Sequence, residues 1–398
     1  MGARVAYWGY CVLRWVLGVL PLSMGVGLGR WVGSVLWWIG GGYRGLVLRN
    51  LRLAYGETLP LSEARAIGRE HFARLVSNMF AGAKLGRMGA SRALELVEVK
   101  GMEHARELVA QGRGIVTLLS HLGNWELLAQ VAPLLLGCPC GTVYQSLSNP
   151  WIDAAVCRQR AREGMRLFAR KEGFFSALDL LRSGGAVGVL ADQHAGDSGL
   201  WAPFFGRMAS TSPLPATMAL RTGAAILPVA VYTLPRGRWR IVISPPVRPE
   251  VEEVGALTAQ LNRVLEGQIR ESPADWLWSH NRWKTPRPQF LLGKTKRGMV
   301  AEGVTRRFRL VVRSTNWLGD AVMTVPAVKA MRRTRPDLEL TVLAPAKIAG
   351  LWEAIPEVDR VVALPEGGGI IATARLLRAG GYDAVVVLPN SLRTGLEA

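Results

Sequence analysis

The chain has 398 residues, 49% of them hydrophobic, and its 49 basic and 30 acidic side chains give a formal charge of +19. This length predicts two or three domains, and the apolar fraction is too low for a polytopic membrane protein but suits an enzyme with an apolar anchor or surface. The charge suits anionic lipid head groups, an acidic protein or nucleic acid, although a compositional preference for arginine would also produce it. The four cysteines form neither a disulfide framework nor a zinc spacing, which fits a reducing compartment.

Residues 7–42 are dominated by Trp, Val, Leu, Ile and Gly, with Arg14 and Arg30 as interruptions. The uncharged runs are shorter than the ~18 residues of a clear transmembrane helix. Two interpretations remain open: a single span whose arginines extend towards the head groups, or a hairpin or interfacial helix in one leaflet. The five tryptophans favour membrane contact because indole prefers the head-group layer. We therefore predict a membrane anchor, in the form of a membrane-associated N-terminal helix, over residues 1–43.

Residues 44–290 form the predicted main domain. Its first part, up to about residue 92, has helical periodicity, and Ser62 is the expected cap of one helix. Short apolar runs then alternate with helical segments, which is typical of an α/β domain with a largely parallel sheet. The expected strands are Gly114–Ser120, Gly141–Tyr144, Ala186–Ala191, Ala224–Tyr232 and Trp239–Ile243, and a last amphipathic helix covers Thr258–Glu271.

A polar, basic and glycine-containing stretch, residues 291–307, is typical of a linker. Strand–helix alternation then restarts, with a helix expected over Ala321–Arg333. The expected strands are Phe308–Arg313, Glu339–Leu343, Val361–Ala363 and Ala384–Leu388. The sequence therefore predicts a partial, doubly wound Rossmann-like unit over residues 308–398.

The segment Ser120–Glu126 carries the candidate chemistry, because it follows a predicted strand and opens a predicted helix. Open α/β sheets place ligands at such strand ends. His121 on this turn is the candidate general base, and Glu126 is the candidate carboxylate that fixes its tautomer. The alternative is a structural histidine beside a surface glutamate, since a bare His-x4-Glu spacing is common by chance.

The surrounding motifs resemble those of the lipid A lauroyl/myristoyl acyltransferases, part of the wider lysophospholipid acyltransferase group, over about residues 5–290. They occur in order along the chain: Ser120–Glu126, Tyr144, Asn149-Pro-Trp, Arg158-Gln-Arg160, Leu190-Ala-Asp192-Gln193, Pro203-Phe-Phe-Gly206, Ala209-Ser-Thr211, Arg221-Thr-Gly-Ala and Trp276-Leu-Trp-Ser-His280. The resemblance implies that His121 is the general base and Glu126 its partner. It also implies that Arg160 and Asp192 are needed for activity, Arg160 to bind a phosphate or an oxyanion and Asp192 to hold Arg160.

The same resemblance implies transfer of an acyl group from acyl carrier protein to a lipid A precursor at the cytoplasmic face of the cell inner membrane, without cofactor or metal. The implied substrate-binding residues are Asn124, Phe204, Phe205, Gly206, Thr211 and Arg221. After Gln193 the chain has His194-Ala195 in place of the acidic and aromatic pair common in that family. Chain length and acceptor therefore stay open, and another glycolipid or an aminolipid is an alternative acceptor.

The C-terminal unit resembles the N-terminal half of lipopolysaccharide heptosyltransferases, which use ADP-heptose and a GT-B fold. The resemblance rests on Leu310–Pro326, Leu343-Ala-Pro345, Ile355–Val358 and Tyr382–Ser391, and it makes Asp320 the counterpart of a proposed general base. Because the nucleotide-sugar half is absent, we expect this unit to be an inactive fragment. A non-catalytic membrane scaffold is the competing interpretation of the whole chain, and no helix-turn-helix or basic-aromatic repeat favours nucleic acid.

Overall fold

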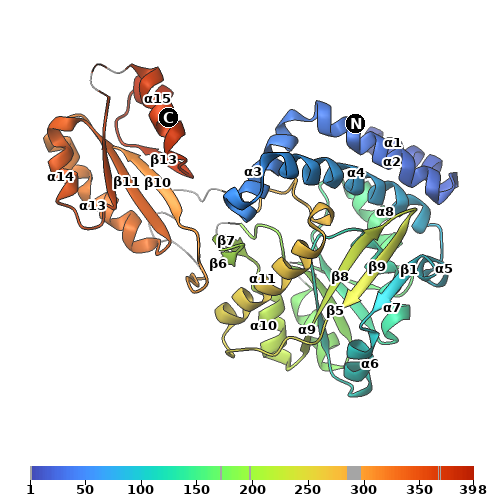
Figure 1. Cartoon of the computed structure of the whole chain (residues 1–398). Helices are drawn as coiled ribbons and strands as arrows, with labels where there is room; N and C mark the ends of the chain where they lie inside the picture. The colour runs from blue at the N-terminus through green and yellow to red at the C-terminus, as the bar shows by residue number, and fades with distance from the viewer. Residues whose placement is uncertain (1, 171–172, 197–198, 285–296, 366, 368) are drawn as a thin grey trace. The chain divides into compact units, whose positions relative to one another are not determined.

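The computed structural model describes residues 2–170, 173–196, 199–284, 297–365, 367 and 369–398. It divides into two compact units (Figure 1), of which unit 1 comprises Met1–His194 and Thr211–Arg282. Unit 2 comprises Ala195–Ser210 and Trp283–Ala398. The segment Ala195–Ser210 thus groups with the C-terminal residues, although it lies inside the range predicted for the main domain.

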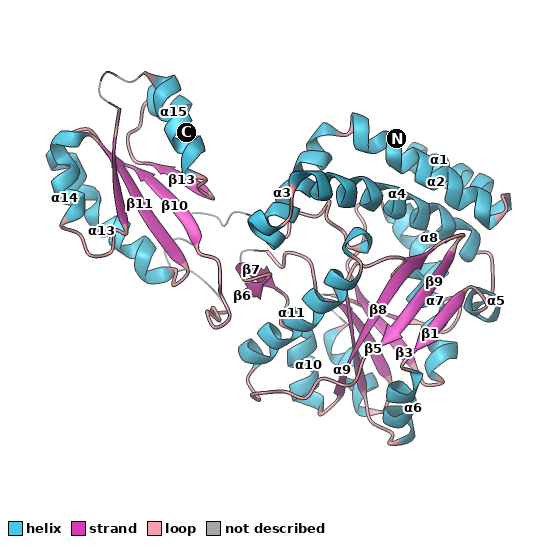
Figure 2. Cartoon of the chain, in the orientation of Figure 1, coloured by secondary structure: helices cyan, strands magenta, loops and turns pink. Residues whose placement is uncertain are grey.

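Unit 1 is built on a seven-stranded sheet in the order β1-β9-β8-β2-β5-β3-β4 (Figure 2). All neighbouring strands are parallel except the β8–β9 pair, which confirms the largely parallel sheet. The five strands expected from the sequence are present, whereas the short, half-exposed strands β1 and β4 were missed. Their bounds are β1 Val97–Lys100, β2 Ile115–Leu119, β3 Cys140–Tyr144, β4 Arg166–Ala169, β5 Ala186–Leu190, β8 Ala225–Leu234 and β9 Arg238–Ile243.

Two groups of helices pack against this sheet and among themselves. One group consists of α5 (Ala90–Leu94), α6 (Met102–Ala110), α7 (Glu126–Leu136) and α8 (Pro150–Ala161). The other consists of α9 (Phe174–Arg182), α10 (Leu214–Thr222) and the expected last helix, α11 (Val254–Glu271), which the short η2 (Pro273–Asp275) follows. The central strand β2 is almost wholly buried, and each of its large aliphatic side chains contributes about 2 kcal/mol of hydrophobic free energy. This rigid strand positions the loop that follows it.

The N-terminal residues form α1 (Gly2–Val19), α2 (Leu22–Ile39), α3 (Gly41–Tyr55), η1 (Gly56–Thr58) and α4 (Leu61–Leu85). Helix α2 lies close against α4 through glycines: a Cβ on Gly33 would lie 2.2 Å from the Phe72 carbonyl oxygen. The prediction that Ser62 caps the N-terminus of α4 is wrong. Helix α4 begins at Leu61 because Pro60, with its restricted φ of −58°, stands at the cap position.

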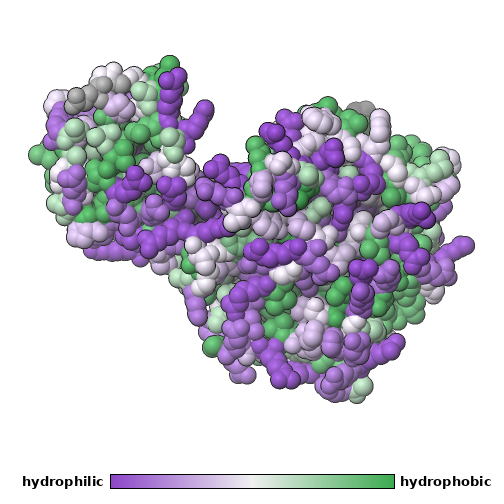
Figure 3. Space-filling model, in the orientation of Figure 1, coloured by the Kyte–Doolittle hydropathy of each residue, from purple (hydrophilic) through white to green (hydrophobic). Residues whose placement is uncertain are grey.

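Helices α1 and α2 expose many large apolar side chains, part of which appear green over these helices in Figure 3. The exposed residues include Trp8, Trp15, Trp31, Trp38 and Ile39. None of the helices in the described part of the chain combines the length and apolar character needed to span a bilayer.

Unit 2 contains a four-stranded parallel sheet in the order β12-β11-β10-β13. Its strands are β10 Phe308–Arg313, β11 Leu338–Ala344, β12 Arg360–Ala363 and β13 Ala384–Val387, close to the expected positions. The helical elements are α13 (Leu318–Thr334), η3 (Ala346–Ile348), α14 (Ala349–Glu353), α15 (Ile370–Gly380) and α16 (Leu392–Glu397).

A hairpin of β6 (Leu200–Phe204) and β7 (Arg207–Thr211) is the other sheet associated with unit 2. The predicted linker partly packs on it: Val300 donates its backbone N–H to Trp201, and Thr305 donates to Gly206. Residues 285–296, which include the start of that linker, lie outside the described residues. The hairpin is also tied to the C-terminal sheet, because Arg207 forms a 2.5 Å ion pair with Asp383.

Candidate active site

The candidate active site begins where β2 ends at Leu119, and α7 starts at Glu126, as the sequence predicted. The connecting loop turns at Gly123, whose φ is +57°. A Cβ at this position would lie 2.2 Å from the Val231 carbonyl oxygen of β8. Only glycine satisfies both the left-handed backbone and the close approach to β8, so this residue fixes the course of the loop.

His121 is held by Asp192 from the loop after β5. The His121 Nδ1 lies 2.8 Å from Asp192 Oδ1, and the His121 backbone N–H donates to Oδ2 at 2.9 Å. The Asp192 side chain is 1% exposed, whereas that of His121 is 15% exposed. Strands β2 and β5 are parallel neighbours, so their carboxyl ends bring these two residues together across 71 positions of sequence. The chain therefore contains a histidine–carboxylate pair with one accessible imidazole.

Burial and charge act in opposite directions on this pair. Burial alone lowers the pKa of His121, but the adjacent Asp192 carboxylate outweighs it and raises that pKa above its ordinary value. Burial likewise acts to raise the pKa of Asp192, and His121 with its hydrogen bonds instead lowers it to about 2. Asp192 is thus ionised at neutral pH and stabilises an imidazolium on His121.

Glu126 has a different partner from the one expected. It forms a two-pronged ion pair with Arg160 of α8, with oxygen–nitrogen distances of 2.5 and 2.9 Å. The predicted pairings, Glu126 with His121 and Asp192 with Arg160, are therefore wrong as direct contacts. Glu126 is the first residue of α7 and its side chain is 43% exposed, so it extends to α8 while the buried Asp192 takes the ring nitrogen.

The Glu126–Arg160 pair still influences His121 electrostatically. Glu126 acts to raise the pKa of His121, and Arg160 acts to lower it. The pair also gives Arg160 a fixed orientation beside the candidate base, since a guanidinium binds a carboxylate through two parallel hydrogen bonds. Arg160 is therefore paired through two hydrogen bonds and is not merely a solvated charge on α8.

Trp276 and His280 belong to one of the sequence motifs, but no role was predicted for either residue. The indole N–H of Trp276 donates to Asp192 Oδ2 at 2.7 Å. His280 Nε2 accepts the backbone N–H of His194 at 3.0 Å, and burial, followed by the charge of Arg282, lowers the pKa of His280 to about 4. The density of aromatic residues after α11 was the available signal, but it does not specify which carboxylate they contact.

The other predicted site residues are distributed over the molecule. Asn124 is buried in the loop beside His121, and its Nδ2 has no hydrogen-bond partner among the described residues. Thr211 is buried and accepts a hydrogen bond from Arg282 at 2.7 Å. Arg221 is exposed near the end of α10, with its guanidinium 5.6 Å from the Phe174 ring. The substrate-binding roles of Thr211 and Arg221 stay predictions.

Phe204, Phe205 and Gly206 belong to unit 2. The two rings are buried and pack on Trp283, with centroid distances of 5.8 and 6.2 Å. Phe205 and Gly206 form the two-residue turn of the β6–β7 hairpin, both with positive φ. A Cβ on Gly206 would lie 2.2 Å from the Thr305 hydroxyl, which accounts for the glycine. A role in acyl binding stays a prediction.

Asp320 lies exposed in the first turn of α13, because this helix begins at Leu318, three residues before the start expected from the sequence. Within the described part of the chain, no group of three or more His, Cys, Asp or Glu side chains is arranged to hold a metal ion.

Comparisons with known proteins identify the family of the N-terminal 285 residues. The family described as bacterial lipid A biosynthesis acyltransferase matches residues 2–285. The lipid A biosynthesis lauroyltransferase of Escherichia coli (strain K12) is 28% identical over 248 residues, which is 61% of this chain and 79% of that protein. The palmitoleoyltransferase of the same strain is 26% identical over 49% of this chain and 64% of its own length. A phosphatidylinositol mannoside acyltransferase of Mycolicibacterium smegmatis is 26% identical over 50% of this chain and 66% of its own length.

Proposed function

Because the chain belongs to the family of bacterial lipid A biosynthesis acyltransferases, we propose that it transfers a fatty acyl group from the thioester of acyl carrier protein to a hydroxyl of a lipid A precursor. His121 is the general base of this reaction. The observation that carries the proposal is the 2.8 Å contact between His121 Nδ1 and the buried Asp192 carboxylate. That contact leaves Nε2 as the ring nitrogen able to take a proton.

The proposed reaction needs no nucleophile from the protein. Nε2 of neutral His121 accepts the proton of the acceptor hydroxyl while the hydroxyl oxygen attacks the thioester carbonyl carbon. The resulting oxyanion collapses, the carbon–sulfur bond breaks, and the departing thiolate takes the proton from the imidazolium. Asp192 accepts the Nδ1–H throughout, so it fixes the tautomer and stabilises the transient positive charge.

The Arg160–Glu126 pair and the loop residue Asn124 supply further polar groups to the proposed active site. Arg160 provides a permanent positive charge for the oxyanion or for a phosphate of the acceptor, and Glu126 orients it through two hydrogen bonds. The buried Nδ2 of Asn124 is a hydrogen-bond donor without a partner among the described residues. Such a donor is costly to bury unless a ligand uses it, so we assign it to the substrate.

The exposed apolar surface of α1 and α2 supports attachment to the cytoplasmic face of the inner membrane by the interfacial mode. Tryptophans suit the head-group layer, and the basic surplus favours an anionic leaflet. The same positive charge favours an acidic carrier protein as acyl donor.

The test is mass spectrometry of lipid A from cells that express the wild-type chain, the His121→Ala variant or neither. We expect wild-type cells alone to gain the mass of one acyl group. Gln130→Ala is a matched control because Gln130 lies on the same helix as Glu126 but contacts the backbone of Leu85 and Met88. Acyl transfer that survives His121→Ala would refute the mechanism and revive the scaffold interpretation.

A mannosylated glycolipid is the second candidate acceptor, because one relative is a phosphatidylinositol mannoside acyltransferase. The same experiment separates the two acceptors. A gain of acyl mass in a mannolipid or aminolipid with unchanged lipid A would select the second candidate.

For residues 308–398 we propose an N-terminal heptosyltransferase half that is inactive in this chain. Its support is the parallel four-stranded sheet and the exposed Asp320 at the start of α13. The measurement is transfer of heptose from ADP-heptose by the purified chain. Detectable transfer that Asp320→Asn abolishes would overturn the proposal.

A further inference from the structure

The segment after α11 lies alongside the loop that carries His121 and pairs with its backbone. Leu122 and Trp276 form an antiparallel β-bridge, and the backbone N–H of Leu277 donates to the His121 carbonyl at 3.0 Å. On the other side, the Gly123 N–H donates to the Asp275 carbonyl at 2.9 Å. Residues 275–277, which we call the strap, are therefore hydrogen-bonded to the backbone of His121 and Gly123, the residues on either side of Leu122.

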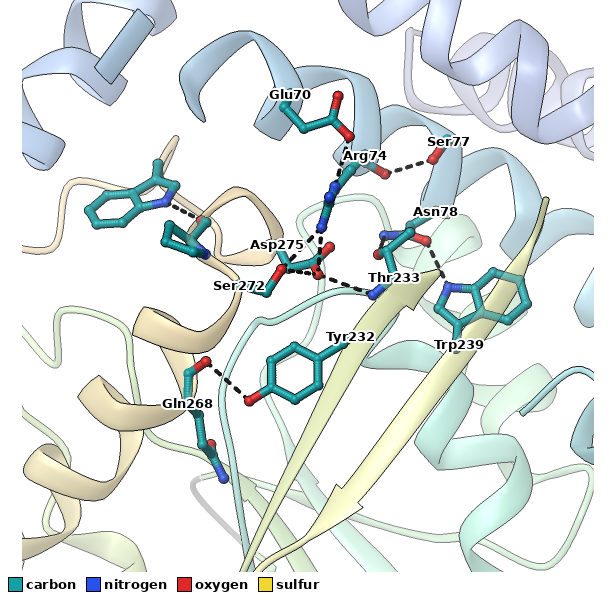
Figure 4. Close-up of polar contacts among 12 residues, drawn as sticks. Glu70, Arg74, Ser77, Asn78, Tyr232, Thr233, Trp239, Gln268, Ser272 and Asp275 are labelled. Atoms are coloured by element: carbon teal, nitrogen blue, oxygen red, sulfur yellow. Dashed lines mark hydrogen bonds and ion pairs between the residues drawn. The ribbon is translucent and has the colours of Figure 1, made fainter. Parts of the chain in front are cut away.

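The strap is itself anchored by a buried carboxylate, shown in Figure 4. The Asp275 side chain is 0% exposed, and its Oδ2 accepts hydrogen bonds from Arg74 at 2.9 Å and from Ser272 at 2.7 Å. The Thr233 backbone N–H at the end of β8 donates to the same oxygen at 3.1 Å. Glu70 holds Arg74 in turn at 2.8 Å. Helix α4 and strand β8 thus fix the strap, so Trp276 has little freedom to move relative to the loop.

Trp276 connects the strap to the catalytic pair. Its indole N–H donates to Asp192 Oδ2 at 2.7 Å, the oxygen that also accepts the His121 backbone N–H. The other oxygen of Asp192 is left to the imidazole. Two donors on one oxygen determine the rotation of the carboxylate, and they withdraw negative charge from it.

We propose that Trp276 is a positioning residue for the acyl transfer proposed above: its indole N–H orients Asp192 and moderates the basicity that Asp192 imposes on His121. This inference rests on the proposed function for its kinetic consequences only. Its effect on the protonation of His121 is a property of the folded protein and is measurable without substrate.

The sign of the effect follows from the hydrogen bonds. Loss of the indole donor concentrates negative charge on Asp192, which stabilises the imidazolium and raises the pKa of His121. Neutral His121 then appears only at higher pH, so the acid limb of the kcat profile moves upward. The other titratable or charged groups that act on His121 are Glu126 of α7, Arg160 of α8 and His280 after the strap.

The experiment compares Trp276→Phe with Trp278→Phe. Trp278 is a matched control: it is also fully buried, packs edge-to-face on Trp276 at 4.6 Å, and donates its indole N–H to the Pro273 carbonyl instead of a catalytic carboxylate. For Trp276→Phe we expect the His121 pKa, followed by NMR of the imidazole, to rise by roughly half a unit or more. We expect kcat to fall roughly tenfold with KM within about twofold of the wild type. The Trp278→Phe control is expected to leave the pKa of His121 unchanged.

An unchanged His121 pKa in folded Trp276→Phe, or an equal rise in the Trp278→Phe control, would overturn the inference. If Trp276→Phe fails to fold, a comparison of the wild-type protein with the Asp192→Asn variant supplies the second measurement. The Trp276 indole N–H resonance is expected to differ between the two proteins, and an unmoved resonance overturns the inference. Absence of acyl transfer in the wild type would refute the proposed function while leaving the NMR result to decide this inference.

Discussion

Replacement of Asp192 by asparagine tests the catalytic pair most directly, because the structure determines how the new amide is oriented. The position of Oδ2 receives two donors, the His121 backbone N–H and the Trp276 indole N–H. The oxygen of the introduced amide must occupy that position, so its NH₂ group faces His121 Nδ1. An N–H donor there forces the proton of neutral imidazole onto Nε2, and Nε2 then has no lone pair for the acceptor hydroxyl.

We expect Asp192→Asn to lower kcat by about 10³- to 10⁴-fold, the loss typical of a triad histidine locked in the wrong tautomer. This loss corresponds to roughly 4–5.5 kcal/mol at 1.36 kcal/mol per tenfold change in rate. KM is expected to change little, because Asp192 is buried behind the imidazole. The assay is steady-state transfer of a radiolabelled acyl group from acyl carrier protein to the glycolipid acceptor.

Glu126→Gln is the comparison variant, because it also converts a carboxylate to an amide but at the position that contacts Arg160. A kcat for Asp192→Asn within tenfold of the wild type, together with a larger loss for Glu126→Gln, would refute the assignment of Asp192 as the partner of His121. It would restore the pairing first expected from the His-x4-Glu spacing.

Three further perturbations follow from the structure. Glu126→Gln is expected to lower the pKa of His121 and Arg160→Gln is expected to raise it, because the two charges act on the imidazole in opposite directions. NMR titration of His121 checks this prediction, and pKa shifts of the same sign in both variants would contradict it. Burial lowers the pKa of His71 to about 4, so the unfolded chain binds a proton that the folded chain does not, and stability falls as the pH drops from about 6.5 to 4. Chemical denaturation should show that His71→Asn removes about 3 kcal/mol of that pH dependence, and an unchanged dependence of the unfolding free energy on pH would argue against it. Gly123→Ala is expected to abolish acyl transfer and lower the unfolding midpoint, because the methyl group meets the Val231 carbonyl, and full activity would show that the loop has another course.

The strands and the catalytic loop were predictable because their signals are local. The buried strands β2, β5 and β8 have predominantly apolar sequences, and a histidine that follows such a strand lies at the carboxyl edge of the sheet. The strands β1 and β4 were missed because they are only four residues long and half exposed. The grouping of Ala195–Ser210 with unit 2 depends on long-range contacts such as Arg207 to Asp383, which no local pattern reveals.

The partner of His121 could not be predicted from the spacing of residues in the sequence. Glu126 follows His121 by five positions and Asp192 follows it by 71, so proximity in sequence favours the glutamate. Strand order reverses that preference, because β2 and β5 are hydrogen-bonded neighbours and deliver both loops to one edge of the sheet.

The His-x4-Glu spacing nevertheless has a physical meaning in this fold. It places the carboxylate on the first residue of α7, where it holds Arg160 in a fixed orientation. The guanidinium lowers the pKa of His121 and the carboxylate raises it, so the pair adds an oriented donor without a large net charge acting on the imidazole. The protonation of His121, the proposed base, is therefore governed mainly by Asp192 and by the groups that bind Asp192. The two residues of the His-x4-Glu motif thus belong to two different pairs, His121 with Asp192 and Glu126 with Arg160.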